Sequence, residues 1–497
     1  MLYSQTLGRA ARWYPDQTGV VDGNRRLSYR ELDRKVERLA GMLAARGFVP
    51  GDRLAFLLPN CLEFIELAYA CCRLGVIAVP INTRYSLPEI EGVLRDSTPS
   101  GFVGHATLPR PRVAAEWHLI VGEQALEGSD DPAPPPFYDP QAIYGLFYTS
   151  GTTGRAKGVM LSHYNLLANV LHGQGVFRFR VGDAWLHAAP MCHVADFPTV
   201  LSTAAFGVTQ VTLPRFDLGL LCETIQRERI TATVLIPTMV NFLTQYPELG
   251  RYDLSSLERF LYGGSPMAPE IVKRTREKLP GVELYQGYGL TETSPLLTVL
   301  EDQDQTGGRL MSCGRPVLGA ELQVVDFEGN LVPVGTPGEI VARGANIMKG
   351  YWKQPQATRE AFFGDWFRTG DVAYQDAEGY FYIVDRRKDM IVTGGENVYS
   401  SEVEAAVYAH PAVKEAAVIG VPDTQWGEAV MACVVIKEGA TLTAEELQAH
   451  CRARLANYKV PKRVEFFPGE LPKSGTGKIL KRALREPYWK GLARGVA

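Results

Sequence analysis

The chain has 497 residues, of which 46% are hydrophobic and 22% charged, and its formal net charge is −3. This composition is ordinary for a folded globular protein and excludes a largely disordered chain. The near-neutral charge argues against a general nucleic-acid binder, which carries a basic excess. The length accommodates one large domain together with a small one.

Cysteine usage and the apolar segments favour a cytoplasmic protein. None of the eight cysteines belongs to a C-x-x-C pair, so we predict free thiols in a reducing compartment. Residues 1–16 contain no long apolar core, and we therefore predict no secretory signal. The most apolar stretch, about Cys61 to Ile81, contains Glu63, Glu66 and Arg73, and these charges argue against a membrane span.

Helix-like and strand-like segments alternate along the first part of the chain. A helix is predicted from Ser28 to Gly47, with Ser28 as N-cap and Glu31 as its capping-box partner. The alternation continues through the strand Asp52–Leu58, a helix that stops at Gly75, the strand Val76–Pro80, the helix Glu89–Ser97 and strand candidates within Gly101–Val121. This order favours a layered α/β architecture.

The strongest local signal is the segment Tyr148-Thr-Ser-Gly-Thr-Thr-Gly-Arg-Ala-Lys-Gly158, between an apolar strand and a helix-like run. Its glycines allow tight turns that point backbone N–H groups at an anion, and its hydroxyls and lysine add donors and charge. A Walker A loop would need Ser or Thr directly after the lysine, whereas Gly158 follows Lys157 here. The sequence therefore predicts a phosphate-binding loop of another type, formed by Thr149, Ser150, Gly151, Thr152, Thr153, Gly154 and Lys157.

The composition of the chain and the length of its predicted elements change after about Gly314. Short strands rich in Val, Gly and Pro predict a small β-rich subdomain: Glu321–Asp326, Gly338–Arg343 and Tyr380–Val384. After Asp385 a compact α+β unit follows, with helices Ser400–His410 and Thr443–Leu455 and strands Lys414–Val421 and Ala429–Lys437. We therefore predict two domains, 1–385 and 386–497.

Further motifs follow the phosphate loop in a fixed order: Gly263-Gly-Ser-Pro-Met-Ala268, Tyr288-Gly-Leu-Thr-Glu292, Trp366-Phe-Arg-Thr-Gly-Asp371, Asp385-Arg-Arg-Lys-Asp-Met-Ile391 and Pro472-Lys-Ser-Gly-Thr-Gly-Lys478. With these motifs the chain resembles the adenylate-forming superfamily of acyl-CoA synthetases, peptide-synthetase adenylation domains and luciferases. The resemblance runs from about Ser28 to Lys481. It implies a large N-terminal domain of layered αβαβα sheets with a small β-barrel subdomain, and a mobile small α+β C-terminal domain.

The resemblance also implies an AMP-forming acid–thiol ligase that uses ATP, Mg²⁺ and coenzyme A. It places the β- and γ-phosphates on Thr149–Lys157, the adenine on Gly264, Ser265 and Tyr288, the α-phosphate on Thr291, Mg²⁺ on Glu292, and the ribose on Asp371 and Arg386. Lys478 is implied as the catalytic lysine that bridges the carboxylate and the α-phosphate. Each residue also has a plainer interpretation: Asp371 as a turn residue, Tyr288 as core, Glu292 as a helix cap and Lys478 as a surface lysine.

Transfer to the thiol is implied to involve a second set of residues. Lys388 aligns with the hinge about which the C-terminal domain rotates, and Gly394 and Gly395 line the pantetheine tunnel. Arg84, Trp426 and Tyr458 match CoA-contacting positions of the 4-chlorobenzoate–CoA ligase type, although both aromatic residues could serve ordinary packing. Val460 stands where that type carries a basic residue, which puts the nucleotide end of the CoA site in doubt.

The acid itself is less narrowly defined. By resemblance, His193 is the gate beside an acyl pocket that is lined by mostly apolar or small residues, among them Gly287. Asp196 is expected either to cap the helix that begins near Phe197 or to read a polar group on the substrate. We expect an aryl acid or a medium-chain fatty acid, with the aryl acid favoured. A carrier protein in place of CoA, and oligomerisation, stay open.

Overall fold

The computed structural model describes residues 4–130, 133–149, 156–264, 267–473 and 479–490. Its contacts divide the chain into a first unit, formed by Met1–Leu322 and Ala342–Phe367, and a second unit, formed by Gln323–Val341 and Arg368–Ala497. The division passes within strands β16 (Ala320–Val325), β17 (Gly338–Gly344) and β20 (Trp366–Gln375). A domain boundary after residue 385 stays a prediction from the sequence.

The first unit contains a seven-stranded sheet in the order β18-β8-β7-β4-β3-β5-β6. Its central strands β7, β4, β3, β5 and β6 pair in parallel, while β8 and β18 continue the sheet antiparallel. The strand bounds are β3 Arg53–Phe56, β4 Ile77–Pro80, β5 Gly101–His105, β6 Trp117–Val121, β7 Ile143–Thr149, β8 Lys157–Ser162 and β18 Gly350–Tyr351.

A second sheet of the first unit has nine strands in the order β15-β14-β13-β12-β11-β9-β10-β1-β2. The strands from β13 to β1 pair in parallel, and antiparallel strands complete both edges. The bounds are β1 Thr18–Asp22, β2 Arg25–Ser28, β9 Ala184–His187, β10 Thr209–Thr212, β11 Ala232–Leu235, β12 Arg259–Gly263, β13 Glu283–Gly289, β14 Leu296–Leu300 and β15 Arg315–Pro316.

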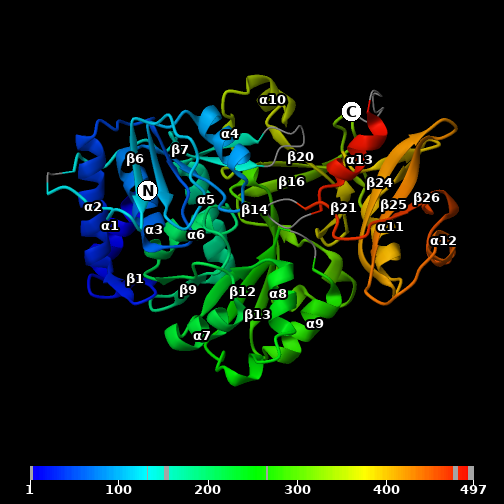
Figure 1. Cartoon of the computed structure of the whole chain (residues 1–497), viewed down its shortest axis with the longest axis horizontal. Coiled ribbons are helices and arrows are strands. Elements are labelled where there is room, and N and C mark those ends of the chain that lie inside the picture. Colours follow the sequence, from blue (N-terminus) through cyan, green and yellow to red (C-terminus); the bar gives the residue numbers. More distant parts are fainter. Residues whose placement is uncertain (1–3, 131–132, 150–155, 265–266, 474–478, 491–497) are drawn as a thin grey trace. The chain divides into compact units, whose positions relative to one another are not determined.

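Helices cover both faces of these sheets, as Figure 1 shows for the blue to green part of the chain. On the seven-stranded sheet, Phe56 packs against α3, α5 and α6, whereas its neighbour Leu57 packs toward α4. The nine-stranded sheet packs its other face on α7, α8 and α9. The helices are α1 Ser4–Trp13, α2 Tyr29–Ala45, α3 Leu62–Leu74, α4 Leu87–Ser97, α5 His163–Phe177, α6 Phe197–Ala205, α7 Leu218–Glu228, α8 Pro237–Thr244 and α9 Pro269–Lys278. Alternating burial along strands therefore produces the predicted αβαβα layers.

Local signals in the sequence set the ends of the helices. Ser28 caps α2, and Glu31 completes the capping box by accepting a hydrogen bond from the Ser28 backbone N–H at 2.8 Å. Gly75 ends α3 with φ of 72°, a left-handed conformation that suits glycine. Both predictions are confirmed.

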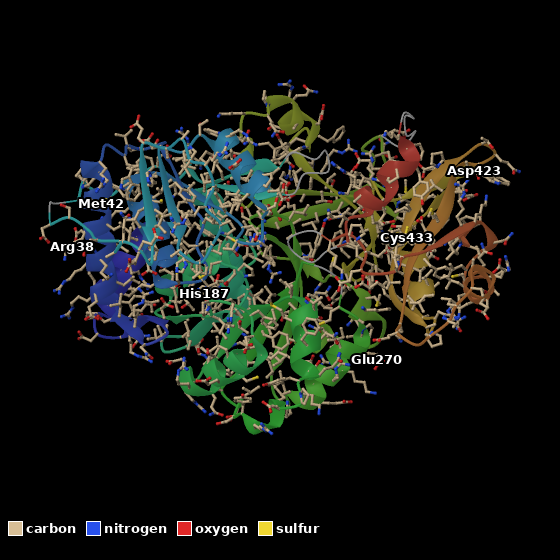
Figure 2. The ribbon with its side chains drawn as sticks, in the orientation of Figure 1. Arg38, Met42, His187, Glu270, Asp423 and Cys433 are labelled. Atoms are coloured by element: carbon tan, nitrogen blue, oxygen red, sulfur yellow. The ribbon has the colours of Figure 1, made fainter. Side chains whose placement is uncertain are left out.

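The second unit contains a sheet in the order β23-β22-β25-β24, with β26 paired to β25. The bounds are β22 Ile391–Thr393, β23 Glu396–Val398, β24 Val413–Asp423, β25 Gly427–Ile436 and β26 Arg463–Phe466, with helices α11 Ser400–Tyr408, α12 Ala444–Arg452 and α13 Lys481–Trp489. The predicted helices and strands of this α+β unit are confirmed within a few residues. Cys433 of β25, labelled in Figure 2, lies in its core.

The remaining strands form a sheet in the order β16-β17-β20-β19, with β21 (Phe381–Arg386) paired to β20. Strand β19 covers Phe362–Phe363, helix α10 covers Pro355–Glu360, and 3₁₀ turns η1 to η5 cover Leu249–Arg251, Thr291–Thr293, Asp302–Asp304, Gly307–Met311 and Asn457–Lys459. All eight cysteines are buried free thiols, as predicted. No helix in the described part of the chain is both long and apolar enough to span a membrane.

Two histidines of α5 should make the first unit acid-sensitive. His163 and His172 are buried, and burial lowers the pKa of each from 6.5 to about 4. The unfolded chain therefore binds more protons than the folded one between these values, so stability falls as pH drops from 6.5 toward 4. At about pH 5 each histidine should cost about 2 kcal/mol of unfolding free energy.

His163→Gln tests this prediction, because the variant removes one of the two titrating rings. The unfolding temperature of the native chain should fall on going from about pH 7.5 to about pH 5, and it should fall less in His163→Gln. Thermal scans followed by circular dichroism at both pH values measure the difference. Equal losses in both proteins would contradict the assignment.

Candidate functional site

The phosphate loop joins two antiparallel strands. Strand β7 enters it and β8 leaves it, and the last pair of their register is Thr149 with Lys157. The loop therefore opens into a strand and not directly into a helix, because α5 begins only at His163. This corrects the helix-like run expected after the loop. The described residues do not include five of the predicted loop residues: Ser150, Gly151, Thr152, Thr153 and Gly154.

A tyrosine joins the exit of this loop to Glu292. The Lys157 ammonium lies 4.7 Å from the centre of the Tyr351 ring, and the Tyr351 hydroxyl donates to Glu292 Oε1 at 2.9 Å. Burial and the Glu292 charge raise the pKa of Tyr351, so the phenol stays protonated and able to donate. Tyr351 stood in no motif of the sequence, and only the pairing of β18 with β8 brings it to the site.

The turn that carries Thr291 and Glu292 is fixed by a buried amide. Asn346 donates from Nδ2 to the carbonyls of Thr293 and Leu296, at 2.9 and 2.7 Å. The Glu292 carbonyl accepts from the Met348 N–H at 2.8 Å. Thr291 and Glu292 are half-buried in η2, where their side chains can meet a ligand. The helix-cap interpretation of Glu292 is not supported, because Thr293 and not Glu292 makes the side-chain hydrogen bonds at Leu290.

The adenine-side residues lie at the ends of two neighbouring strands. Gly263 pairs with Gly287, and a Cβ on Gly263 would come within 2.3 Å of the Gly287 carbonyl oxygen. Gly264 follows with φ of +78°, a conformation that favours glycine. Tyr288 is half-buried on β13. Ser265 lies outside the described residues.

A small apolar pocket lies beside these strand ends. Its lining comes from α6, β12 and the segment after Glu292, together with α5, the turn after α5 and Trp185 of β9. The lining residues are Asn169, Val170, Gly173, Phe177, Phe179, Trp185, Ala195, Pro198, Thr199, Ser202, Leu261, Pro295 and Leu296. Gly287 lies behind Leu261 and Leu296, which a Cβ there would meet at 3.2 and 3.0 Å.

Three aromatic rings line this pocket. The ring of Trp185 stands edge-on to Phe177 and Phe179, with centroids 5.4 and 5.6 Å away, and the two phenylalanines stack on each other. This is the geometry that aromatic rings prefer. The three residues form a rigid aromatic wall.

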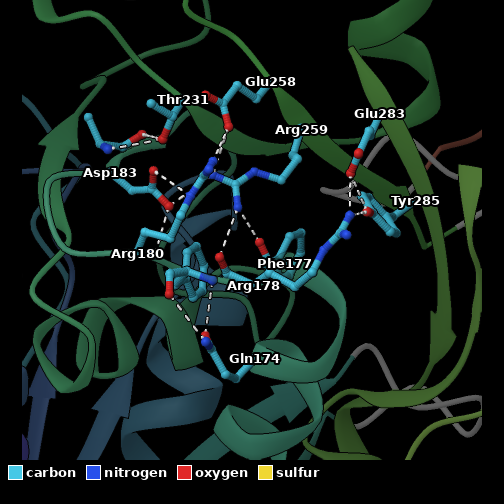
Figure 3. A network of polar contacts seen from close by, with 12 residues as sticks. Gln174, Phe177, Arg178, Arg180, Asp183, Thr231, Glu258, Arg259, Glu283 and Tyr285 are labelled. Carbon is cyan, nitrogen blue, oxygen red and sulfur yellow. Dashed lines mark hydrogen bonds and ion pairs between the residues drawn. The ribbon is translucent and has the colours of Figure 1, made fainter. Parts of the chain in front are cut away.

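Figure 3 shows the polar network that holds this wall. Arg259 is buried and donates to the carbonyl of Phe177 and to Asp183 Oδ2, the latter at 2.9 Å. Gln174 exchanges two hydrogen bonds with the backbone of Phe179, at 3.1 and 3.2 Å. The backbone on both sides of Arg178 is therefore fixed, and the two phenylalanine rings with it.

The carboxylate of Asp196 neither caps α6 nor faces the pocket, which corrects both expectations for this residue. It is fully buried, and its oxygens accept from Trp185 Nε1 at 3.0 Å and Thr199 Oγ1 at 2.6 Å and contact His187 Nδ1 at 2.9 Å. It makes no side-chain cap hydrogen bond. Since Trp185 and Thr199 line the pocket, Asp196 supports the pocket wall from behind.

His193, the predicted gate residue, belongs to a loop that two asparagines hold. Asn60 binds the carbonyls of His187 and Ala189 from Nδ2 and accepts from the Met191 N–H, each at 2.8 Å. Asn82 Nδ2 lies 3.3 Å from His193 Nε2, and Asn82 Oδ1 accepts from the Arg84 N–H. The predicted CoA residue Arg84 is thus two residues from a side chain that contacts the gate.

In the second unit, the two predicted ribose residues form an ion pair. Arg386 Nε lies 3.1 Å from Asp371 Oδ1, and the residues face each other across β20 and β21. Asp371 is buried, whereas Arg386 is exposed. The pair keeps a carboxylate fixed beside a cation, a suitable acceptor for vicinal hydroxyls.

The predicted CoA residues of the second unit lie around one loop. Gly394 and Gly395 have φ of +60° and +85°, and a Cβ on Gly394 would be 2.8 Å from the Trp426 ring. Trp426 and Tyr458 are 43% and 39% exposed, which argues against core packing for either ring. Lys462 lies 4.3 Å from the Trp426 ring centre and supplies a cation close to the buried Val460.

The predicted hinge and the catalytic-lysine segment are anchored by residues that the sequence did not single out. The Lys388 carbonyl accepts from Arg485 Nη1 at 2.9 Å. Lys473 pairs with Ile479 across the catalytic segment and contacts Glu415 at 2.7 Å. Lys478 itself lies outside the described residues.

No cluster of three or more His, Cys, Asp or Glu side chains suited to a metal ion occurs among the residues that the structure describes. Mg²⁺ in nucleotide sites is commonly held by one or two carboxylates together with phosphate oxygens, and it needs no such cluster. Glu292, oriented by Tyr351 beside the phosphate-loop lysine, fits that mode of binding.

Comparisons agree with this arrangement. Residues 7–352 match the family model "AMP-binding enzyme", and residues 402–478 match "AMP-binding enzyme C-terminal domain". The chain is 41% identical to the feruloyl-CoA synthase of an Amycolatopsis species over 97% of this chain and 98% of that protein. It is 37% identical to the long-chain-fatty-acid–CoA ligase FadD13 of Mycobacterium tuberculosis over 93% of each. The o-succinylbenzoate CoA synthetase of Bacillus subtilis, solved with its acyl-adenylate, superposes with a TM-score of 0.89 at 30% identity, covering 96% and 97% of the chains.

The support of the Glu292 turn by Asn346 can be tested directly. Asn346→Ala would leave the carbonyls of Thr293 and Leu296 buried without donors, at a cost of roughly 1–3 kcal/mol each. We expect the KM for ATP to rise about tenfold. Pyrophosphate release at varied ATP measures this. Asn241→Ala on α8, which loses only contacts to Gln245 and Arg274, should keep the native KM. Equal KM values for both variants would contradict the role of Asn346.

Proposed function

The chain belongs to the AMP-binding enzyme family of adenylate-forming enzymes, and from that premise we propose that the acid it activates is an aryl acid. The chain is an AMP-forming acid–thiol ligase, and its substrates are a carboxylic acid, ATP and CoA, with Mg²⁺ as cofactor. The family match and the curated CoA ligases that align over nearly the whole chain support this activity.

The reaction proceeds in two steps, since a free carboxylate offers a thiol no adequate leaving group. In the first step a carboxylate oxygen attacks the α-phosphorus of ATP, the bond to the β-phosphate oxygen breaks, and pyrophosphate departs. In the second step the CoA sulfur attacks the acyl carbonyl, and AMP leaves. Catalysis of both steps depends on positioning and on neutralising phosphate charge.

Within the first unit, we assign ATP binding to the elements around Glu292. Lys157 and the phosphate loop would hold the β- and γ-phosphates, Tyr288 the adenine and Thr291 the α-phosphate. When bound, Mg²⁺ would neutralise phosphate charge, with Glu292 as its protein ligand.

In the second unit, Asp371 and Arg386 would hold the ribose, and Lys478 would bridge the two reacting groups. The proposed contacts to the pantetheine of CoA are Gly394, Gly395, Trp426 and Tyr458. The proposed contact to the CoA phosphate is Arg84 of the first unit.

The observation that carries the aryl assignment is the aromatic wall of the pocket. The apolar pocket, called the slot below, is lined by Phe177, Phe179 and Trp185, and Arg259 and Gln174 fix the backbone behind the two phenylalanine rings. A planar ring fills such a slot and gains edge or stacking contacts, whereas an extended alkyl chain needs an open path. The 41% identity to a feruloyl-CoA synthase supports the same choice.

Polar groups in the slot favour a ring substituent that can accept a hydrogen bond. Asn169 accepts from the Leu296 N–H through Oδ1 at 3.2 Å, which leaves its amide nitrogen for a ligand. Ser202 is buried in the same lining. A phenolic or methoxy oxygen would meet these donors, and an unsubstituted chain would leave them unpaired. The proposed substrates are therefore hydroxylated aryl acids.

A fatty acid is the second candidate, because the FadD13 ligase aligns at 37% identity. A pyrophosphate-release screen over hydroxylated cinnamates and benzoates, medium-chain fatty acids and amino acids separates the two. We expect kcat/KM to be highest for a hydroxylated aryl acid. Free CoA should be consumed at the same rate as pyrophosphate is released. Preference for a fatty acid, or adenylation without CoA consumption, would overturn the proposal.

Opening the aromatic wall should shift the preference of the enzyme. Phe179→Ala removes one of the three rings that line the slot, so we expect kcat/KM for octanoate to rise relative to that for the preferred aryl acid by about tenfold, as expected for one large apolar contact. Phe363→Ala, which truncates an exposed phenylalanine of β19, should leave the ratio unchanged. Paired kinetics with both acids measure it. An unchanged ratio in Phe179→Ala would place the acid elsewhere.

Lys478 is assigned to the first step alone. Lys478→Ala should lower acyl-adenylate formation by roughly 10²–10³, the loss expected for one preorganised donor to developing charge. Thioester formation from supplied acyl-adenylate should change far less. Separate assays of pyrophosphate release and of CoA consumption from the adenylate test this. Equal losses in the two assays would contradict the assignment.

A further inference from the structure

The segment from Met348 to Trp352 contacts both halves of the proposed phosphate and metal site. Its backbone pairs with β8, directly after the phosphate loop, through Lys349 N–H to Met160 at 2.9 Å and Trp352 N–H to Gly158 at 2.8 Å. The Met348 N–H binds the Glu292 carbonyl. One short strand therefore fixes the position of the loop exit relative to the Glu292 turn.

Tyr351 lies at the centre of this segment, and its backbone is fully constrained. Its own N–H donates to Thr358 Oγ1 at 2.9 Å, and its neighbours on both sides are held by the strand pairing. The side chain is half-buried. The ring and hydroxyl are consequently placed by the fold and not by contact with a ligand.

The two ends of the tyrosine serve two different charges. The face of the ring lies under the Lys157 ammonium at 4.7 Å, a cation–π contact. The hydroxyl donates to Glu292 Oε1 at 2.9 Å, a charge-assisted hydrogen bond that restricts the rotamers of the carboxylate.

We propose that Tyr351 is a positioning residue that orients the Glu292 carboxylate toward the metal ion of the ATP complex and holds Lys157 in place beside it. The proposal rests on the assignment of Glu292 as a metal ligand. Outer-shell partners that orient a ligating carboxylate commonly change metal affinity by 10- to 100-fold when they are removed. Loss of the hydroxyl should therefore act on metal binding, and loss of the ring should in addition act on the phosphates.

Two substitutions separate these contributions. Tyr351→Phe keeps the ring beneath Lys157 and removes the donor to Glu292, whereas Tyr351→Leu removes both. Mn²⁺ serves as the probe for the metal site, because free Mn²⁺ is measured by electron paramagnetic resonance. Its affinity for the enzyme–ATP complex is determined without acid, so that no turnover occurs. ATP binding without metal is followed by protein fluorescence in EDTA.

Tyr351→Phe should weaken Mn²⁺ binding about tenfold and leave metal-free ATP binding unchanged. Tyr351→Leu should weaken both. Tyr246→Phe is the matched control, because it removes a phenol–carboxylate hydrogen bond to Glu248 elsewhere in the first unit, and it should bind Mn²⁺ as the native chain does. Unfolding temperatures of all variants establish that they are folded.

Glu292→Gln tests the route by which Tyr351 acts. Glu292→Gln alone should weaken Mn²⁺ binding, and adding Tyr351→Phe to it should cause no further loss. A full additional loss in the double variant would overturn the proposal, as would native Mn²⁺ affinity in folded Tyr351→Phe. Native affinity in Glu292→Gln would remove the metal assignment of Glu292 itself. None of these outcomes depends on which acid the enzyme prefers.

Discussion

The backbone pairing between β18 and β8 is the constraint on which the geometry of the first unit's site depends. The phosphate loop and the turn with Glu292 are about 135 residues apart in sequence, and the segment Met348–Trp352 is hydrogen-bonded to both the turn and the strand that leaves the loop. Met348 binds the Glu292 carbonyl, and Trp352 binds the Gly158 carbonyl. Asn346 completes the support by donating to the carbonyl of Thr293, which ends the turn, and to that of Leu296, three residues further on. The proposed phosphate loop and the proposed metal-binding carboxylate therefore share one rigid frame, which is what a preorganised site for a polyanion requires.

Buried charge serves the acyl pocket in a different way. Asp196 would be costly to bury alone, but Trp185, His187 and Thr199 satisfy its oxygens, and Trp185 and Thr199 in turn form pocket wall. The buried pair of Arg259 and Asp183 holds the far end of the same wall. His187, labelled in Figure 2, is fully buried within the first unit. The charges stay out of the slot and make its apolar surface rigid, which favours a ligand of fixed shape over a flexible chain.

In the second unit, polar contacts hold the segments that border the predicted hinge and the predicted catalytic lysine. Lys481 is partly buried and contacts Glu404 at 2.8 Å and Ser400 at 2.6 Å, so α13 is fastened to α11 just after the predicted catalytic segment. Asp385 accepts from the same serine and joins the end of β21 to this network. The polar cluster of Asp385, Ser400, Glu404 and Lys481 thus joins β21, α11 and α13 within the second unit.

The sequence by itself determined the layered fold, most helix and strand positions, the family and the motif residues, because periodicity, caps and glycine-rich loops are local properties of the chain. It could not place Tyr351, Asn346, Asn82 or Asn169, since each acquires its role through a partner 53 to 127 residues away, and a lone Tyr or Asn carries no local signal. The same reason explains why Asp196 was misread: next to Phe197 and Pro198 it looks like a helix cap, and only the tertiary structure brings Trp185 and His187 to its carboxylate. Long-range packing, and not the local pattern, decided which polar groups meet a ligand and which hold the walls of the site.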